Sequence, residues 1–261
     1  MELGISYWFG YPSFPQERIR LLLEAGFTSV SLHWTDEYEA VTGKKESISP
    51  LLYKNGIQIS SFHLSFDDAH YLWCNTKQGE EYRSSVHKAI DDAQNYNVPV
   101  IIIHTDGEEY TPSRIHFLLD LVSYAASKNV CLCLENLQHE DNLENILQIA
   151  DSTSLSLCYD IGHANIRNCP FDPVKDRRVK YLHIHDNFSI NDSHLLPYTG
   201  NVDWEKSIGM IQKINMDVDG ILEVHGSLDS YDEAKSYLEC AAECRRTLLR
   251  KINAICNVRE K

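Results

Sequence analysis

Eight short β-like segments alternate with segments of helical periodicity along almost the whole chain. The predicted strands are Leu3–Trp8, Thr28–Trp34, Gln58–Ser65, Pro99–Asp106, Val130–Asn136, Leu155–Gly162, Tyr181–Asn187 and Gly220–Gly226. The predicted helices are Pro15–Ala25, Glu80–Tyr96, Ser113–Ser127, Leu143–Ala150, Trp204–Ile214 and Tyr231–Ile255, with a short helix near the end of Thr35–Asn55 and mostly loop over Asn165–Arg178. Such strict alternation is typical of a parallel sheet whose strands are connected through helices.

The number of repeats and the chain length favour the closed form of such a sheet. Eight strand–helix units in 261 residues match a (β/α)8 barrel, which commonly takes about 250 residues. An open doubly wound sheet would be expected to carry a glycine-rich phosphate motif, and neither GxGxxG nor GxxxxGK[ST] occurs. No linker suggests a second domain. We therefore predict an α/β fold, a single TIM-barrel domain over residues 1–261 with its active site at the C-terminal ends of the strands.

Charge and composition narrow the class of partner. The chain has 24 Lys+Arg against 38 Asp+Glu, and the formal charge of −14 disfavours DNA. The longest apolar run, Val98–Ile103, is far shorter than the roughly 20 residues that cross a bilayer, and Met1–Gly4 opens no secretory signal. None of the eight cysteines forms a CxxC pair, which favours reduced cysteines in a cytoplasmic protein with no membrane partner. The apolar positions of the long helix Tyr231–Ile255 leave a homo-oligomer open.

Acidic and imidazole side chains gather at the predicted C-terminal ends of six successive strands. In chain order they are His63, His104, Glu135, Asp160, His163, His183, His185, Asp192, His194, Glu223 and His225. Because side chains alternate along a strand, Cys131 and Cys133 share a face with Glu135, and His183 shares a face with His185. Small residues followed by a polar residue at the strand end fit the inward face of a barrel, where these side chains would meet.

Such a group of carboxylates and imidazoles points to a metal. Carboxylates in one cavity repel one another, and a divalent cation keeps them ionised together. Mixed histidine and carboxylate ligands without thiolate suit Zn²⁺, Mn²⁺ or Co²⁺. Any one of these residues taken alone could be an ordinary solvated or hydrogen-bonded group, so the prediction rests on their joint placement at one rim.

Several short motifs around these residues resemble one known superfamily. They are Leu134-Glu135-Asn136, Asp160-Ile161-Gly162-His163, His183-Ile184-His185-Asp186-Asn187, Asp192-Ser193-His194 and Leu222-Glu223. Together they resemble the xylose isomerase-like TIM-barrel superfamily, which holds sugar isomerases and epimerases together with endonuclease IV, the family that nicks DNA at abasic sites. The resemblance covers nearly the whole chain. It implies a metal-dependent enzyme and is not specific for one substrate.

The two branches of that superfamily imply different sites. By resemblance to the ketose 3-epimerases, one metal would be held by Glu135, Asp160, His183 or His185, and Glu223. By resemblance to endonuclease IV, two or three zinc ions would be held by up to nine residues. The chain has a candidate for each of the nine, namely His63, His104, Glu135, Asp160, His163, His183, Asp192, His194 and Glu223.

Departures from both patterns leave the choice open. Endonuclease IV typically has Asp-Thr-Cys-His on strand six, where this chain has Asp160-Ile161-Gly162-His163. It has His-x-Asn-Asp followed by a lysine on strand seven, where this chain has His185-Asp186-Asn187. The arginine expected shortly after the strand-seven histidine of the epimerases is missing. The segment from His194 to Trp204 resembles the HLxPGxGxxDW run of sugar isomerase-like members, with Tyr198 at the first glycine position.

The leading hypothesis is a metal-dependent isomerase or epimerase of a small sugar or related polyol. The metal would chelate the substrate carbonyl and stabilise an enediolate, while Glu135 and Glu223 remove and return the proton. The predicted substrate contacts are His185, Trp8, Trp34 and Phe66. The alternative is an endonuclease IV-like phosphodiester hydrolase with a di- or trinuclear zinc site, and an inactive barrel that only binds a ligand is a third class.

Overall fold

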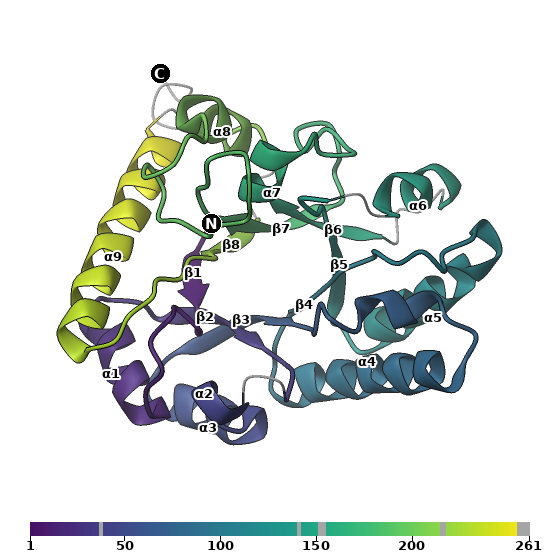
Figure 1. Ribbon diagram of the computed structural model, residues 1–261, viewed down its shortest axis with the longest axis horizontal. Coiled ribbons are helices and arrows are strands. Elements are labelled where there is room, and N and C mark those ends of the chain that lie inside the picture. Colours follow the sequence, from purple (N-terminus) through teal and green to yellow (C-terminus); the bar gives the residue numbers. More distant parts are fainter. Residues whose placement is uncertain (37–38, 140–141, 151–154, 215–217, 255–261) are drawn as a thin grey trace.

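Eight parallel strands close into a barrel, in which each strand pairs with the next and β8 pairs with β1 (Figure 1). The computed structural model describes residues 1–36, 39–139, 142–150, 155–214 and 218–254. The strands are β1 (Leu3–Ser6), β2 (Ser29–His33), β3 (Gln58–His63), β4 (Val100–Ile103), β5 (Cys131–Glu135), β6 (Ser156–Asp160), β7 (Val179–Ile184) and β8 (Asp219–Leu222). The predicted fold class, a single (β/α)8 TIM barrel, is confirmed, with strand bounds that differ by a few residues from the predicted ones.

The helices lie around the outside of the barrel (Figure 1). They are α1 (Pro15–Glu24), α2 (Glu39–Thr42), α3 (Lys45–Lys54), α4 (Lys77–Asn95), α5 (Ile115–Ser127), α6 (Leu143–Ile149), α7 (Ile161–Ile166), α8 (Trp204–Ile211) and α9 (Tyr231–Asn253), with 3₁₀ turns η1 (Ala69–Trp73) and η2 (Pro112–Arg114). Local sequence explains their ends. Thr76 and Ser230 cap α4 and α9 through their hydroxyl groups. Arg250 and Lys251 in the last turn of α9 complement the helix dipole.

Two predicted segments need correction. The predicted strand Leu155–Gly162 ends at Asp160, because the Asp160 side chain accepts a hydrogen bond from the backbone N–H of His163 at 2.7 Å and caps α7. Helix α7 therefore takes the start of the predicted loop Asn165–Arg178. The segment Thr35–Asn55 contains two helices, α2 and α3, instead of one. The last residue of the predicted helix Tyr231–Ile255 lies outside the described residues, as does Cys256.

Side-chain alternation gives the barrel wall two faces. Outward residues such as Ile101, Leu132 and Leu182 belong to the main core beneath the helices. Inward residues form a second cluster inside the barrel, which we call the floor, and its members are Val100, Ile102, Cys131, Cys133, Cys158, Tyr181 and Ile221. The next inward position on these strands is polar, and we call the ring of inward acids and imidazoles at the C-terminal strand ends the rim. The sequence alternation therefore places the polar groups at one end of the barrel.

The remaining expectations concern the surface and the cysteines. Apolar residues of α9, among them Leu238 and Leu248, are buried within the chain, where α9 contacts α1 and α8. This helix therefore gives no argument for an interface, and a homo-oligomer stays a prediction. The seven cysteines in the described part of the chain are free. Among the helices of the described residues, none has the length and apolar character needed to cross a membrane.

Candidate active site

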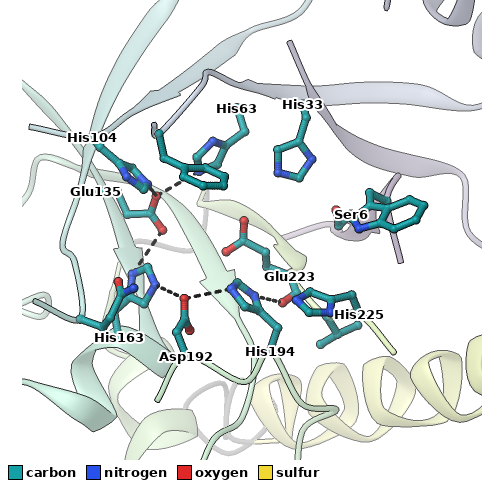
Figure 2. A pocket seen from close by; sticks show the side chains of 14 residues that line it. Ser6, His33, His63, His104, Glu135, His163, Asp192, His194, Glu223 and His225 are labelled. Carbon is teal, nitrogen blue, oxygen red and sulfur yellow. Dashed lines mark hydrogen bonds and ion pairs between the residues drawn. The ribbon is translucent and has the colours of Figure 1, made fainter. Parts of the chain in front are cut away.

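The nine candidate ligands named from the sequence lie together at the rim. Seven of them line one cavity (Figure 2), whereas Asp160 and His183 do not. The nine come from strand ends, from α7 and from the β7–α8 loop: His63, His104, Glu135, Asp160, His183 and Glu223 at or directly after strands, His163 in α7, and Asp192 and His194 in the loop. All nine are buried or partly buried. Buried ionisable groups are costly unless paired or bound to a cation, so their contacts decide what the site can do.

Glu135 joins two groups of imidazoles. Its Oε2 lies 3.2 Å from His63 Nε2 and 3.1 Å from His104 Nε2. Its other oxygen, Oε1, lies 2.7 Å from His183 Nδ1. One carboxylate therefore faces two different clusters of ligand-type nitrogen atoms.

The central cluster surrounds His183. Its Nδ1 lies 3.0 Å from Glu223 Oε2 and 3.7 Å from Asp160 Oδ2, in addition to the contact with Glu135. The four residues come from the ends of β5, β6, β7 and β8. The resemblance to mononuclear epimerases implies these residues, with either His183 or His185 as the imidazole.

Besides the pair His63 and His104 and the central cluster, a further group, which we call the Asp192 cluster, forms around Asp192. Its Oδ2 lies 3.0 Å from His163 Nε2 and 3.0 Å from His194 Nε2. His163 Nδ1 lies 3.7 Å from Glu135 Oε1, which links this cluster to the others. Figure 2 shows the resulting line of contacts from His104 through Glu135, His163 and Asp192 to His194.

Three of these imidazoles have one ring nitrogen fixed by the backbone. The Nδ1–H groups donate to carbonyl oxygens at 2.7–2.8 Å, from His63 to Leu64, from His163 to Asn136 and from His194 to Glu223. In the neutral ring Nε2 then carries a lone pair. Each Nε2 faces a carboxylate oxygen, so two electron-rich atoms meet unless the ring is protonated or a cation lies between them. This is the usual arrangement of histidines that bind metals.

The crowding shifts the charge states of the rim. Burial opposes ionisation of Glu135 and Glu223, but the nearby imidazoles, His183 above all, hold the pKa of both carboxyls well below the usual value. Burial likewise opposes protonation of His194, but Asp192 and Glu223 raise its pKa to about 9. When no cation is bound, protons on the imidazoles therefore neutralise the carboxylates. Binding of a cation would release these protons.

Several buried rim atoms have no hydrogen-bond partner among the described residues. They include Asp160 Oδ2, Asp192 Oδ1 and His185 Nε2. An unpaired buried polar atom costs about 1–3 kcal/mol, so a cluster of them calls for a further group that binds all of them. Oxygen and imidazole nitrogen donors in this number fit a divalent cation such as Zn²⁺, Mn²⁺ or Co²⁺.

His185 does not line the cavity, and neither do Asp160 and His183. The side chain is fully buried, and its Nε2 lies 3.1 Å from Asp160 Oδ1 and 3.4 Å from Asp192 Oδ1. Its ring stacks on His194 at 4.3 Å between centroids and occupies the space where Gly162 lacks a Cβ. The role of His185 as a substrate contact stays a prediction. His185 is thus a second buried imidazole, which lies between Asp160 of the central cluster and Asp192.

The loop that carries Asp192 and His194 is held by Asp186. The Asp186 backbone pairs with Leu195, and its carboxylate accepts hydrogen bonds from Trp204 Nε1 at 2.8 Å and from the Val202 backbone N–H at 3.0 Å. Gly200 is required here because a Cβ would overlap Asp186 Oδ1. These contacts explain the run from His194 to Trp204, in which Tyr198 adopts a positive φ of 74°.

The rim encloses a cavity of about 220 Å³. Its lining includes eight of the eleven acids and imidazoles named from the sequence, together with Ser6, Trp8, His33, Phe66, Gln138 and Val224. Trp8 and Phe66, two of the four residues predicted to contact the substrate, thus line the cavity. Drug-sized ligands occupy pockets of roughly 300–1,000 Å³, so this cavity suits a smaller molecule.

Trp34 does not line the cavity, because it follows His33 on the opposite face of β2. It stacks on Phe62 at 4.0 Å between ring centroids, and its Nε1 donates to Asp92 Oδ2 at 3.1 Å. His33, which the sequence-based prediction omits, lines the cavity instead. The alternation in Ser29-Val30-Ser31-Leu32-His33 carries the signal that would have identified it, since the serines and His33 share the polar face.

Comparison with known proteins supports the fold and the family. A protein family described as "Xylose isomerase-like TIM barrel" matches residues 19–244. An uncharacterised protein of Methanocaldococcus jannaschii is 22% identical over 255 residues, covering 85% of this chain and 86% of that protein.

Solved structures of similar shape include sugar epimerases. A D-tagatose 3-epimerase-like protein has a TM-score of 0.75 at 19% identity and covers 97% of this chain and 100% of its own. L-ribulose 3-epimerase has a TM-score of 0.76 at 12% identity, covering 100% and 99%. The IOLI protein, solved with a binding zinc atom, has a TM-score of 0.72 at 12% identity, covering 97% and 98%. At these identities the likeness establishes the fold.

Proposed function

Because the chain belongs to the xylose isomerase-like TIM barrel family, we propose that it is a divalent-metal-dependent isomerase or epimerase of a small sugar or related polyol. One observation carries the proposal. Glu135 and Glu223 both line a single small cavity, and their carboxylates lie 2.7 Å and 3.0 Å from the same nitrogen, His183 Nδ1. Two carboxylates beside one prospective cation are what proton transfer at a carbon next to a carbonyl requires.

The central cluster is the proposed metal site. Glu135, Asp160, His183 and Glu223 would hold the cation, with His185 as the alternative imidazole. When bound, Zn²⁺, Mn²⁺ or Co²⁺ would polarise the substrate carbonyl and make the neighbouring C–H group more acidic.

The two glutamates would move the proton. Both are ionised at neutral pH, because the imidazoles keep the pKa of each carboxyl low, so either can accept a proton from a substrate carbon. Figure 2 shows the Glu223 side chain directed into the cavity between His33 and Asp192, with Glu135 at one side of it. Removal of a proton by one carboxylate and return by the other would invert a carbon centre.

The other cavity residues would orient the substrate. Burial and the neighbouring His63 lower the pKa of His33 to about 3, and burial with His194 lowers that of His225. A neutral imidazole both donates and accepts hydrogen bonds, which suits sugar hydroxyl groups. Trp8 and Phe66 supply aromatic faces for the C–H side of the ring.

Substitution of Glu135 tests the proposal. The chain is loaded with Zn²⁺, Mn²⁺ or Co²⁺ and incubated in D₂O with a panel of aldoses and ketoses, and ¹H NMR follows exchange of carbon-bound hydrogen. We expect exchange with at least one sugar in the wild type and a fall of about 10²–10⁴-fold in Glu135→Gln, because the proton acceptor is removed.

The matched control is Glu205→Gln, at an exposed glutamate of α8 away from the cavity, which should exchange at the wild-type rate. Circular dichroism verifies that both variants fold. Wild-type exchange in Glu135→Gln, or no exchange of any sugar with any of the three metals, would contradict the proposal.

A second candidate is a phosphodiester hydrolase with a di- or trinuclear zinc site, and the Asp192 cluster favours it. A mononuclear enzyme has no evident need for Asp192 between two imidazoles at 3.0 Å. Metal analysis of the zinc-loaded chain discriminates: about one zinc per chain supports the epimerase, and two or three, with hydrolysis of bis(4-nitrophenyl) phosphate, supports the hydrolase. The formal charge of −14 disfavours DNA as its substrate.

The cellular location and the kind of partner are also proposals. Free thiols at all seven described cysteines fit a reducing compartment, and we place the protein in the cytoplasm on that ground. The size of the cavity fits a small-molecule partner.

A further inference from the structure

Asn136 follows directly after Glu135 at the end of β5, and its side chain is buried. Its amide makes two hydrogen bonds to the backbone of one residue on the next strand. Nδ2 donates to the Asp160 carbonyl oxygen at 3.0 Å, and Oδ1 accepts from the Asp160 N–H group at 2.9 Å. The side chain thus acts as a peptide group would, and it extends the pairing of β5 with β6 beyond the last backbone pair, Glu135 with Cys158.

The Asp160 carboxylate is held at one oxygen and open at the other. Oδ1 accepts the hydrogen bond from the His163 N–H group at 2.7 Å that caps α7. Oδ2 has no hydrogen-bond partner among the described residues and lies 3.7 Å from His183 Nδ1. Because Asn136 holds the backbone of Asp160 and the cap holds Oδ1, the remaining oxygen faces the central cluster.

The backbone of Asn136 holds a second candidate ligand. Its carbonyl oxygen accepts from His163 Nδ1 at 2.8 Å, which leaves Nε2 of that ring 3.0 Å from Asp192 Oδ2. Such a contact fixes the tautomer and the orientation of a histidine that binds a metal. Asn136 therefore orients one member of the central cluster through its side chain and one member of the Asp192 cluster through its backbone.

We propose that Asn136 is a positioning residue of the metal site, whose amide sets Asp160 so that Oδ2 faces the cation. The inference rests on the proposed function only in that the central cluster binds a divalent cation, whatever reaction follows. A substitution at Asn136 removes the amide and keeps the carbonyl. Its effect should therefore fall on Asp160 and leave the contact of His163 in place.

This role differs from that of an amide that only joins two strands. A purely structural amide would stabilise the barrel and leave the metal affinity of the folded chain unchanged. A positioning amide orders a ligand before the cation arrives, and loss of such a partner typically lowers metal affinity by about 10–100-fold. Metal affinity and stability must therefore be measured separately.

Zinc titration of the chelator-treated full chain, in competition with a chromophoric chelator at pH 7, tests the proposal. Asp160→Asn first identifies the binding step to which Asp160 contributes. Asn136→Leu keeps the approximate shape of the side chain and removes both hydrogen bonds, so it should weaken that same step by about 10–100-fold. Asn136→Ser leaves space for water beside the Asp160 backbone, and it gives a second variant in case Asn136→Leu does not fold.

Leu157→Ala is the matched control for a loss of stability. Leu157 lies on β6, as Asp160 does, but it is fully buried in the main core on the outward face of the strand. This variant should lower the urea midpoint of unfolding at least as much as Asn136→Leu does. Its zinc affinity should stay at the wild-type value, because the amide and Asp160 are untouched.

The visible spectrum of bound Co²⁺ gives a second readout, because it reports the arrangement of the ligands. Both Asn136 variants should alter the spectrum, and Leu157→Ala should keep that of the wild type. Wild-type zinc affinity and spectrum in the Asn136 variants, or failure of both to fold, would overturn the positioning role and leave the proposed function standing. Metal binding without sugar exchange would overturn the proposed function alone, and a wild type that binds no cation would overturn both.

Discussion

The rim and the floor are built from the same strands and the same inward face, yet they treat polar groups differently. At the floor the Tyr181 hydroxyl is hydrogen-bonded: it lies 2.6 Å from Ser60 Oγ and accepts a hydrogen bond from Ser61 Oγ at 3.1 Å. At the rim, Asp160 and Asp192 each keep one buried oxygen without a hydrogen-bond partner. Both ends of the barrel therefore contain polar side chains, but those of the rim include buried atoms that lack a hydrogen-bond partner.

The difference has an energetic consequence. Floor residues contribute to stability through burial and through satisfied hydrogen bonds, so their truncation should lower the free energy of unfolding. Rim residues hold charges that are favourable only with protons or a cation between them. Substitutions at the two ends should therefore separate stability from metal binding.

The largest expected effect on stability is at the floor. Ile102 is fully buried inside the barrel, two residues before His104 on the same face. Ile102→Ala should lower the free energy of unfolding by about 2–5 kcal/mol, because the cavity left behind can close only in part. Urea unfolding measures the loss, and the zinc content per folded chain should stay at the wild-type value.

The same truncation at a surface position is the control for Ile102→Ala. Leu23 on α1 is 38% exposed, and Leu23→Ala should change the free energy of unfolding by less than about 1 kcal/mol. If Ile102→Ala were as stable as Leu23→Ala, or lost its zinc while folded, the separation of floor from rim would fail.

The next largest expected effect on the free energy of unfolding comes from the rim and depends on pH. The folded-state pKa of His194 is raised from 6.5 to about 9, so its contribution is fully present below pH 6.5 and is lost as the pH rises through 9. At 1.36 kcal/mol per pKa unit the contribution is about 3 kcal/mol. Urea unfolding of the chelator-treated protein should therefore show falling stability between pH 6.5 and 9.

Two comparisons check that pH dependence. Zinc should remove it, because the cation replaces the proton. His194→Asn should weaken it, whereas His116→Asn, at an exposed histidine of α5, should leave it as in the wild type. Stability of the metal-free chain that is flat between pH 6.5 and 9 would show that protons do not neutralise the rim.

The alternation rule explains both the success and the error of the sequence-based site. It correctly grouped Glu135 with Cys131 and Cys133, and the same period of two would have chosen His33 over Trp34. Asp192 and His194 follow no periodicity, since a loop places them, and the sequence points to them only by their position just after the seventh predicted strand and by their motif. The rule could not say what surrounds each inward side chain: His183 and His185 share a face, but only the structure shows that neither lines the cavity and that His185 packs against Gly162.

That packing gives the smallest expected effect and a sharp test of how the rim is built. A Cβ at Gly162 would overlap Cε1 and Nδ1 of His185, so Gly162→Ala must displace the ring or shift α7. Overpacking of this kind costs about 1–3 kcal/mol. Gly209→Ala on α8 is the matched control, because a Cβ there meets no atom within 4 Å, and it should be neutral or stabilising by about 0.5–1 kcal/mol.

The double variant decides whether His185 is the cause. His185→Ala removes the ring that occupies the space beside Gly162, so Gly162→Ala should cost little in that background. A double-mutant cycle in urea should then give a coupling energy of at least about 1 kcal/mol, with the pair more stable than the sum of the single changes predicts. Additive effects would mean that the ring moves freely aside, and that the small residue before His163 and the imidazole on β7 are independent. Coupling would mean that they are one adaptation, in which a glycine makes room for a second imidazole between Asp160 and Asp192.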